Sequence, residues 1–276
     1  MRLTEITIGP EKIAALRKGA GDHKYGHGHA LVLSGGAGRT GAARLSARAS
    51  LRIGAGLVTI GAPADAMAEV AAQVTAIMLQ DASDVAEVLE DGRINAVCIG
   101  PGFGVGARCR QAVTAALQAD RACVLDADVF SSFAECAEDL FTLTRGARCV
   151  LTPHEGEFSR LFPDLDLDDR AAACCAAAQR AGCAVVLKGP ATVVGERRVA
   201  VHNSNGLRDA PWLATAGSGD VLAGMICGLL ARGWTPGDAA EAAVWLHAEG
   251  ARVFGPGLTA EDLVEVIPEV FRRIGV

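Results

Sequence analysis

The chain is organised around residues 215–225, Thr215-Ala216-Gly217-Ser218-Gly219-Asp220-Val221-Leu222-Ala223-Gly224-Met225. Gly217 and Gly219 allow a tight turn and let backbone N–H groups come close to a ligand. The apolar run from Val221 to Ala231 predicts a helix, and the unpaired N–H groups and dipole at a helix start favour an anion. Asp220 in the first turn can cap the helix or, beside a substrate hydroxyl, accept its proton. The stretch by itself therefore fits either a capped glycine turn or an anion site with a base.

Composition describes a globular protein with a large core. The 276 residues are 50% hydrophobic and 21% charged, with 33 glycines, which suits one large α/β domain. With neither an internal repeat nor a linker, we expect residues 1–276 to form a single domain, with residues 1–20 as an N-terminal extension packing on it. The net charge of −6 and the lack of a Lys/Arg run argue against nucleic acid or an anionic membrane as a partner.

Targeting and cysteine patterns predict a cytoplasmic protein. Residues 1–18 mix charged and apolar residues, unlike a signal peptide, and the apolar run at 221–231 is too short to span a bilayer. The nine cysteines are an odd number without C-x-x-C spacing, and several lie in apolar runs. We therefore expect them to be core thiols in a reducing compartment.

Short apolar runs alternate with longer amphipathic ones along the chain. The predicted strands are 31–33, 57–60, 96–99, 123–125, 149–151 and 185–187. The predicted helices are 42–53, 108–119, 170–180, 221–231, 236–253 and 259–274. This order predicts right-handed βαβ units and a three-layer α/β/α fold, with a mainly parallel central sheet and helices on both faces. Residues 191–195 and 198–202 instead suggest a hairpin at the sheet edge.

Glycine-rich and acidic loops follow the predicted strands, where ligands of an open parallel sheet collect. They are Ser34-Gly35-Gly36-Ala37-Gly38, Gly100-Pro101-Gly102-Phe103-Gly104, Asp126-Ala127-Asp128, Thr152-Pro153-His154-Glu155-Gly156-Glu157 and Lys188-Gly189-Pro190-Ala191-Thr192. Five such loops together with the 217–220 turn indicate a large ligand that bears phosphates. Asp126 and Asp128 can either cap the next helix or take part in binding phosphate or Mg²⁺.

Two familiar phosphate-binding motifs do not fit. A Walker A loop needs G-x-x-x-x-G-K-[ST], and no glycine precedes Lys188 or another lysine in that way. Residues 36–41 match the string G-x-G-x-x-G, but no acidic residue ends a second strand about 20 residues on, as a dinucleotide-binding Rossmann unit requires. A different phosphate-binding fold is therefore expected.

The histidines differ in what their surroundings predict. His23, His27 and His29 with Asp22 have ligand-like spacing, but they lie in a glycine-rich loop, so a metal site is not favoured. His247 lies among apolar residues on a predicted helix and suits a satisfied core histidine. His154 follows a strand and a proline within a longer motif, which indicates a functional role.

Several motifs in a fixed order resemble the NAD(P)H-hydrate dehydratase family of the ribokinase-like superfamily. They are Gly26-His27 through Leu57-Val58-Thr59, Gly100-Pro101-Gly102-Phe103-Gly104, Leu125-Asp126-Ala127-Asp128, Leu151-Thr152-Pro153-His154-Glu155-Gly156-Glu157, Lys188-Gly189 and the segment 214–224. The resemblance runs from about Gly21 to the C-terminus. The last motif would fit any kinase of that superfamily, whereas Thr-Pro-His-x-Gly-Glu and Gly-Pro-Gly-x-Gly point to the dehydratase.

The resemblance implies a nucleotide-driven dehydration of NADH or NADPH whose nicotinamide ring has been hydrated. ADP is the expected nucleotide, with ATP as the alternative, and Mg²⁺ is expected to bind through phosphates and water, without a protein metal site. The residues matching nucleotide-binding positions are Lys188, Gly189, Pro190, Ala191, Thr192, Gly217, Ser218 and Gly219. The residues matching positions that contact the hydrated dinucleotide are Ala42, Gly104, His154 and Asp220.

The implied mechanism converts a poor leaving group into a good one. Phosphorylating the ring hydroxyl lets the neighbouring ring nitrogen expel phosphate. Asp220 would take the hydroxyl proton as the catalytic base, and the N–H groups of Gly217, Ser218 and Gly219 would stabilise the transferring phosphoryl.

Three departures from the family pattern concern the predicted site. Glu155 stands where the family commonly has proline, and Ser218 replaces a frequent threonine. In the run Ala210-Pro211-Trp212-Leu213-Ala214-Thr215, Ala210 takes the place of a frequent asparagine. Losing that amide near the nucleotide leaves the base or phosphate preference less defined.

The resemblance also implies partners and leaves alternatives open. In many bacteria the domain is fused behind an NAD(P)H-hydrate epimerase, for which this length leaves no room, so a separate epimerase is the expected functional partner, and the expected assembly is a homotetramer. A ribokinase-like kinase that phosphorylates a vitamin-precursor alcohol, with Asp220 as base, is the alternative. A non-catalytic binding protein is less favoured because the Gly-Ser-Gly-Asp segment is intact.

Overall fold

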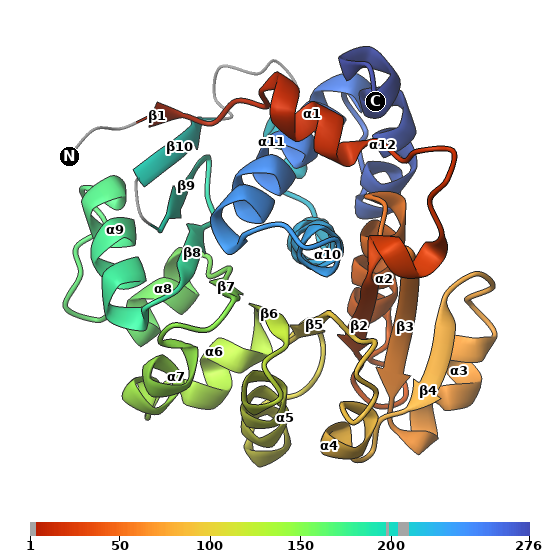
Figure 1. Ribbon diagram of the computed structural model, residues 1–276. Helices are drawn as coiled ribbons and strands as arrows, with labels where there is room; N and C mark the ends of the chain where they lie inside the picture. The colour runs from red at the N-terminus through yellow and green to blue at the C-terminus, as the bar shows by residue number, and fades with distance from the viewer. Residues whose placement is uncertain (1–3, 197–198, 204–209) are drawn as a thin grey trace.

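A ten-stranded, mostly parallel sheet runs through the computed structural model, which describes residues 4–196, 199–203 and 210–276 (Figure 1). Its described strands are β1 Thr4–Glu5, β2 His29–Leu33, β3 Leu57–Ala62, β4 Met78–Asp81, β5 Ala96–Ile99, β6 Ala122–Leu125, β7 Cys149–Leu151, β8 Ala184–Leu187, β9 Ala191–Gly195 and β10 Val199–Asn203. Their order across the sheet is β1-β10-β9-β8-β7-β6-β5-β2-β3-β4. The pairs from β4 to β8 are all parallel, whereas β9 is antiparallel to β8 and to β10.

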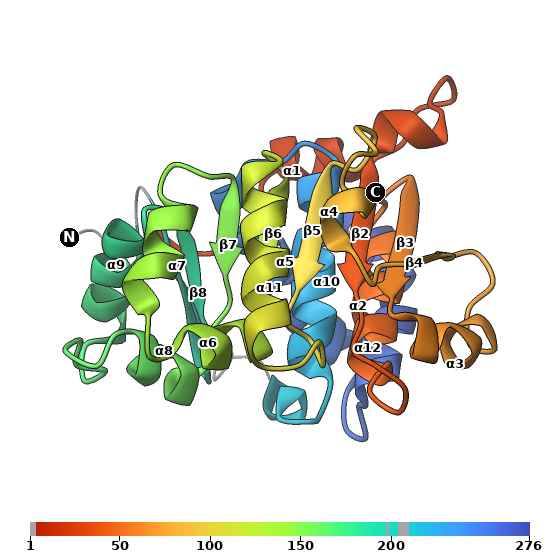
Figure 2. The same ribbon diagram turned by 90° about the horizontal axis from the view of Figure 1, so that it is seen from below.

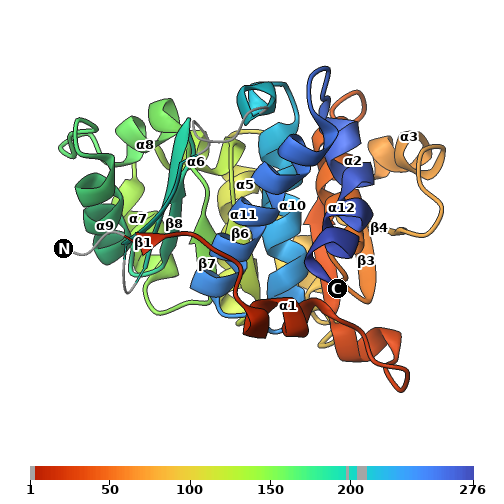
Figure 3. The same ribbon diagram turned by 90° about the horizontal axis from the view of Figure 1, so that it is seen from above.

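Helices cover both faces of this sheet. The described α-helices are α1 Pro10–Leu16, α2 Gly41–Arg52, α3 Met67–Ala71, α4 Val85–Val88, α5 Ala107–Gln118, α6 Asp128–Phe133, α7 Ala137–Thr144, α8 Glu155–Leu161, α9 Arg170–Ala181, α10 Ser218–Ala231, α11 Pro236–Phe254 and α12 Ala260–Ile274. α4 to α9 lie over the face seen in Figure 2, and α1, α10, α11 and α12 over the face seen in Figure 3. The predicted three-layer arrangement is confirmed.

Two hydrophobic clusters fill the spaces between the layers. Successive side chains of a strand point to opposite faces, so in β2 Ala30 and Val32 join the cluster under α2, α10 and α11, and Leu31 and Leu33 join the one under α5. These strands are buried on both sides, which explains why they read as continuous apolar runs.

The predicted elements recur with shifted ends. All six predicted strands and six predicted helices are present, and α10 begins at Ser218, three residues before the predicted start. The hairpin forms as β9 and β10, although residue 198 of the predicted second strand lies outside the described residues. β4 was not predicted because its side chains are largely exposed and form no apolar run. The other unpredicted elements are β1 and the helices α1, α3, α4, α6, α7 and α8.

A close contact between α10 and α2 sets the position of the organising stretch. A Cβ on Gly224 would lie 2.2 Å from the Ser46 carbonyl oxygen, and one on Gly228 would lie 2.6 Å from that of Ser50. The hydroxyls of Ser46 and Ser50 donate to carbonyl oxygens of α10, at Asp220 (2.8 Å) and at Gly224 (2.7 Å). Glycines on α10 therefore let the two backbones touch and hold the start of α10 against α2.

The described part of the N-terminal extension joins the rest of the chain. β1 pairs with β10, and Leu16 of α1 is buried. Lys12 forms an ion pair with Glu241 (2.8 Å), and the Arg232 guanidinium donates to backbone carbonyls of residues 15–17. The assignment of residues 1–276 to one domain stays a prediction.

The thiols behave as core residues. All nine cysteines are unpaired, and seven are buried. Burial raises the pKa of Cys227 to about 12, which keeps that thiol protonated and unreactive. In the described ranges no helix combines the length and the apolarity needed to cross a membrane.

Candidate active site

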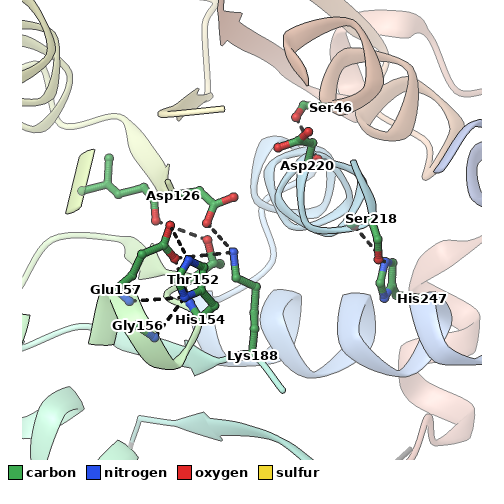
Figure 4. Close-up of polar contacts among 11 residues, drawn as sticks. Ser46, Asp126, Thr152, His154, Gly156, Glu157, Lys188, Ser218, Asp220 and His247 are labelled. Carbon is green, nitrogen blue, oxygen red and sulfur yellow. Dashed lines mark hydrogen bonds and ion pairs between the residues drawn. The ribbon is translucent and has the colours of Figure 1, made fainter. Parts of the chain in front are cut away.

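The site lies where the carboxyl ends of the parallel strands meet the start of α10 (Figure 4). Asp126 follows β6, His154 and Glu157 follow β7, and Lys188 follows β8. The first turn of α10 faces them with Asp220. The parallel topology therefore gathers residues that are far apart in sequence at one edge, as the loop pattern predicted.

A glycine turn opens α10. Gly217 has φ +85°, and a Cβ there would lie 2.7 Å from Leu45 Cδ1 and 2.9 Å from Ala260 Cβ, so only glycine fits. The Val221 N–H bonds to the Gly217 carbonyl at 3.0 Å. The earlier N–H groups, at Gly219 and Asp220, have no carbonyl four residues before them within the helix. This end of α10 can therefore donate to an anion.

Lys188 brings a positive charge to this turn. Its Nζ lies 2.7 Å from Asp126 Oδ1 and 4.0 Å from Glu157 Oε2. A Cβ on Gly219 would come within 3.5 Å of the ammonium. Burial by itself would lower the pKa of Lys188, but the charges of Asp126, Glu157 and Asp220 together raise it. The lysine is therefore charged at neutral pH and is held beside the anion site.

Asp220 is half-buried and has a perturbed pKa. Burial raises the pKa of its carboxyl to about 6, and the negative charges of Asp126 and Asp128 act in the same direction, against the opposing effect of Lys188. Within the described part of the chain the carboxylate forms no hydrogen bond, so the predicted alternative of a helix cap is wrong. A carboxylate with this pKa and no bonded partner is suited to take a proton near neutrality.

Asp126 and Asp128 point to different partners across a strained residue. Asp126 is 1% exposed. Its carbonyl oxygen packs against Gly100, which has φ +125°, and a Cβ on Gly100 would lie only 1.8 Å from that oxygen. Ala127, at φ +47° and ψ −107°, is the N-cap of α6, so the aspartates do not hold that position. Asp128 Oδ2 accepts from the Gly104 N–H (2.8 Å) and from Arg39 (3.3 Å). The two carboxylates thus bind different segments, Asp126 the Lys188 ammonium and Asp128 the Gly104 loop.

His154 caps α8 and faces the pocket. Its Nδ1 accepts from the N–H groups of Gly156 (3.0 Å) and Glu157 (3.3 Å), and Glu157 Oε2 accepts from the His154 N–H (2.8 Å). Because Nδ1 accepts, the neutral ring carries its proton on Nε2. Burial raises the pKa of Glu157, although Lys188 and the His154 N–H oppose that effect. His154 therefore has a structural role that sequence reasoning did not foresee.

A pocket of about 610 Å³ opens beside α10. Its lining residues are His154, Lys188, Gly189, Pro190, Thr192, Pro211, Leu213, Ala214, Thr215, Ser218, Gly219, Leu222, Val244, His247 and Ala248. Apolar walls with a lysine and a helix start at one end suit a ligand with a flat ring and an anionic group. Ala210, the departure from the family pattern, begins the short turn Ala210–Leu213 that supplies part of this wall.

Most predicted nucleotide positions line this pocket, whereas only one of the predicted dinucleotide positions, His154, does so. Ala42 and Gly104 belong to another part of the structure: a Cβ on Gly102 would be 3.4 Å from that of Ala42, and the Gly104 N–H donates to Asp128. His154 lines the pocket instead. The predicted positions outside the pocket lining are Ala42, Gly104, Ala191, Gly217 and Asp220.

Arg170 was missed by sequence reasoning. From the start of α9 its guanidinium donates to the carbonyls of Lys188 (3.1 Å) and Ala191 (3.3 Å), and it pairs with Glu155. A Cβ on Gly189 would lie 2.6 Å from Arg170 Nη2. An arginine at a predicted helix start carries no signal of this role, because the loop that it supports follows a different strand.

The histidines also differ from expectation in part. His247 is buried, as predicted, but it lines the pocket and contacts Ser218. His27 Nε2 lies 3.0 Å from Asp22, and His29 Nε2 lies 2.8 Å from the Thr59 hydroxyl. Among the described residues, no three His, Cys, Asp or Glu side chains are grouped to hold a metal ion.

Comparisons with known proteins agree with this arrangement. The family model for NAD(P)H-hydrate dehydratase matches residues 30–269. The bifunctional NAD(P)H-hydrate repair enzyme of Mycobacterium leprae is 36% identical over 87% of this chain and 49% of its own length. The chain thus spans about half the length of this relative.

Solved structures add the fold. A ribokinase-like superfamily protein of Enterococcus faecalis is similar with a TM-score of 0.81 at 22% identity, covering 98% of this chain and 96% of that one. The ADP/ATP-dependent NAD(P)H-hydrate dehydratase of Bacillus subtilis, co-crystallised with ATP and Mg²⁺, has a TM-score of 0.80 at 26% identity, covering 99% of both chains. With this ribokinase-like fold and the matched family model, the chain belongs to the NAD(P)H-hydrate dehydratase family.

Proposed function

We propose that this protein uses ADP to dehydrate the S-epimer of NAD(P)H-hydrate, which restores NADH or NADPH and releases AMP and phosphate. The observation that carries the proposal is the position of Asp220, a carboxylate with a pKa of about 6 in the first turn of a helix that also offers an anion site. Family membership supports the choice of reaction, and the similar protein of Mycobacterium leprae is an NAD(P)H-hydrate repair enzyme.

The nucleotide would occupy the pocket beside α10. Its base would lie against the apolar walls of the pocket. Its phosphates would lie against Lys188 and the glycine turn at the start of α10. The nucleotide-binding residues proposed are Lys188, Gly189, Pro190, Ala191, Thr192, Gly217, Ser218 and Gly219. The hydrated dinucleotide would contact Ala42, Gly104, His154 and Asp220. In support, Asp220 directly follows Gly219 of the pocket lining, and its pKa is raised by the charge of Asp128, which accepts from the Gly104 N–H.

The chemistry needs one base and one anion site. Asp220 takes the proton of the ring hydroxyl while the hydroxyl oxygen forms a bond to the terminal phosphorus of ADP and the bond from that phosphorus to AMP breaks. Lys188 and the N–H groups of α10 stabilise the charge that develops on the phosphoryl oxygens. The ring nitrogen then expels phosphate, and loss of a proton from the adjacent ring carbon restores the double bond of NADH or NADPH.

Mg²⁺ would accompany the nucleotide. The described residues group no three candidate metal ligands, so they fit an ion held by phosphate oxygens and water better than a protein cage. Asp126 is a buried carboxylate joined to the anion site through its contact with Lys188. When bound, the ion would neutralise phosphate charge.

The setting of the reaction follows from the same resemblance. We propose a single domain, a homotetramer, and an NAD(P)H-hydrate epimerase as the functional partner, which would supply the S-epimer. The contacts of β1 and α1 with the rest of the chain support the single domain. Nine unpaired thiols support a cytoplasmic location.

The reaction can be followed by the absorbance of restored NADH. With NADH-hydrate, ADP and Mg²⁺ the protein should restore NADH and release phosphate in equal amounts, and with the hydrate alone turnover should be negligible. ATP and NADPH-hydrate, tested in parallel, define the preferred substrates. Brisk dehydration without nucleotide would refute the coupled mechanism. A stable phosphorylated thiazole, pyridoxal or sugar alcohol, formed faster than NADH, would instead establish the vitamin-precursor kinase.

A further inference from the structure

The His247 imidazole is a buried polar group of the pocket to which the proposed reaction gives no task. It is 7% exposed, comes from α11 and lies in a wall that also contains Val244 and Ala248. Its Nε2 lies 3.0 Å from the carbonyl oxygen of Ser218 and 3.2 Å from Ser218 Oγ. Figure 4 shows this ring directed at the start of α10.

These two distances define which atom carries the proton. A carbonyl oxygen can only accept, so the contact with the Ser218 carbonyl requires a hydrogen on His247 Nε2. An Nε2 that carries a hydrogen cannot accept from the Ser218 hydroxyl. Ser218 Oγ is therefore an acceptor in this contact, and its own hydrogen is left to donate elsewhere.

The Ser218 hydroxyl is placed to donate its hydrogen to a bound ligand. Ser218 lines the pocket beside Gly219 and Lys188, which form the anion site. Within the described ranges, the hydroxyl makes no hydrogen bond other than the one with His247. A buried hydroxyl gains most from a charged acceptor, and a phosphate oxygen is such an acceptor.

We propose that His247 is a positioning residue for the nucleotide phosphates. Its Nε2–H holds both the carbonyl and the hydroxyl oxygen of Ser218, so that the Ser218 O–H donates to a phosphate oxygen of the bound nucleotide. This inference rests on the proposed use of the pocket by ADP or ATP. The anion site then has, besides the backbone N–H groups of α10, the Ser218 hydroxyl as a side-chain donor. His247 of α11 sets the direction of this donor.

The test is a double-mutant cycle on nucleotide binding, measured by titration calorimetry with ADP and Mg²⁺. Ser218→Ala should weaken ADP binding by about 10-fold to 100-fold, the range for a hydrogen bond to a charged group. His247→Phe, which keeps a ring but has no donor, should weaken it by a similar factor. The double variant should bind about as weakly as Ser218→Ala, because both changes remove the same bond.

Two further variants separate positioning from stability. His247→Gln offers an amide N–H in place of Nε2–H and should recover most of the affinity. Ser50→Ala is the matched control, since Ser50 also donates to a carbonyl of α10 (2.7 Å to Gly224) but lies away from the pocket. It should lower Tm and leave ADP affinity unchanged.

Three results would decide against the inference. Losses that simply add in the double variant, wild-type affinity of His247→Phe, or equal weakening by Ser50→Ala would each show that His247 does not orient the Ser218 hydroxyl. A wild-type protein that binds neither ADP nor ATP would instead contradict the proposed function.

Discussion

The Lys188 ammonium lies 2.7 Å from the carboxylate of Asp126, which is 1% exposed, and both groups face the first turn of α10. A buried lysine keeps its charge only when such a partner is near, and here the partner also fixes the position of the ammonium. An incoming phosphate therefore meets a positive charge that is already in place, which limits the reorganisation needed during transfer.

Asp220→Asn should remove the base and little else. Asn keeps the shape of Asp but cannot accept the hydroxyl proton, so single-turnover dehydration should slow by about 10²-fold to 10⁴-fold. ADP affinity, measured by calorimetry, should stay near wild type. The Asp220 side chain does not cap α10, so the substitution breaks no capping hydrogen bond. Any change in ADP affinity therefore reports the loss of the Asp220 charge alone. A fully active Asn variant would remove Asp220 from the mechanism.

The pH profile should report the raised pKa of Asp220. The base must be ionised, and burial places its pKa at about 6, so kcat/KM for the hydrate should fall tenfold per pH unit below about pH 6. An ordinary aspartate would keep its activity to near pH 4. If kcat/KM instead fell only near pH 4, the base would have an ordinary carboxyl pKa, which would contradict a raised pKa of Asp220.

Asp126→Asn should move that acid limb to lower pH. The negative charge of Asp126 is, after burial, the next cause of the raised pKa of Asp220, so its removal makes ionisation easier. Asp128→Asn is the matched comparison, because its charge acts in the same direction with a smaller effect. Profiles recorded from pH 4 to pH 9 should show the larger shift for Asp126→Asn, and an upward shift would contradict the assignment.

Asp220→Asn should also stabilise the fold at high pH. The folded pKa of about 6 exceeds the ordinary aspartate value of 3.8, so the folded state binds the proton more tightly and ionisation opposes folding. The Asn variant should therefore melt above wild type at pH 8, by roughly 2 to 4 °C for each kcal/mol. The difference should shrink as pH falls through 6 and vanish below about pH 4. A lower Tm at pH 8 would argue against a buried charge.

Gly224→Ala should destabilise the contact between α10 and α2. Its Cβ would lie 2.2 Å from the Ser46 carbonyl oxygen, which is backbone and cannot move alone, so we expect a loss of about 3 kcal/mol or more in unfolding free energy. Gly92→Ala is the control, since a Cβ there meets nothing within 4 Å. It should change the unfolding free energy by less than about 0.5 kcal/mol in urea denaturation.

Arg170→Lys should weaken ADP binding through the Lys188 loop. A single ammonium cannot reach the carbonyls of both Lys188 and Ala191 as the guanidinium does, so we expect a loss of about tenfold. Arg180→Lys changes the same helix, at an exposed pair with Asp164, and should leave binding unchanged. Equal losses in the two variants would show an effect of α9 in general.

The sequence by itself determined the layers and the position of the anion site. Apolar runs of three or four residues, followed by helix-period segments, are local patterns, and they predicted β5 and β7 to the residue and α9 to within one. The glycine turn before α10 was also predictable, because the need for positive φ at Gly217 and a helix start after it are properties of neighbouring residues.

Only the tertiary structure decided which of those residues act on one another. Asp126 and Lys188 are 62 residues apart, and Arg170 reaches a loop that follows a strand after its own helix. The pKa of Asp220 depends on burial and on charges from two separate loops, those after β6 and β8. His247 becomes a pocket residue because α11 packs against the start of α10. Electrostatic interactions depend on distance and burial in space, which no local pattern of residues contains.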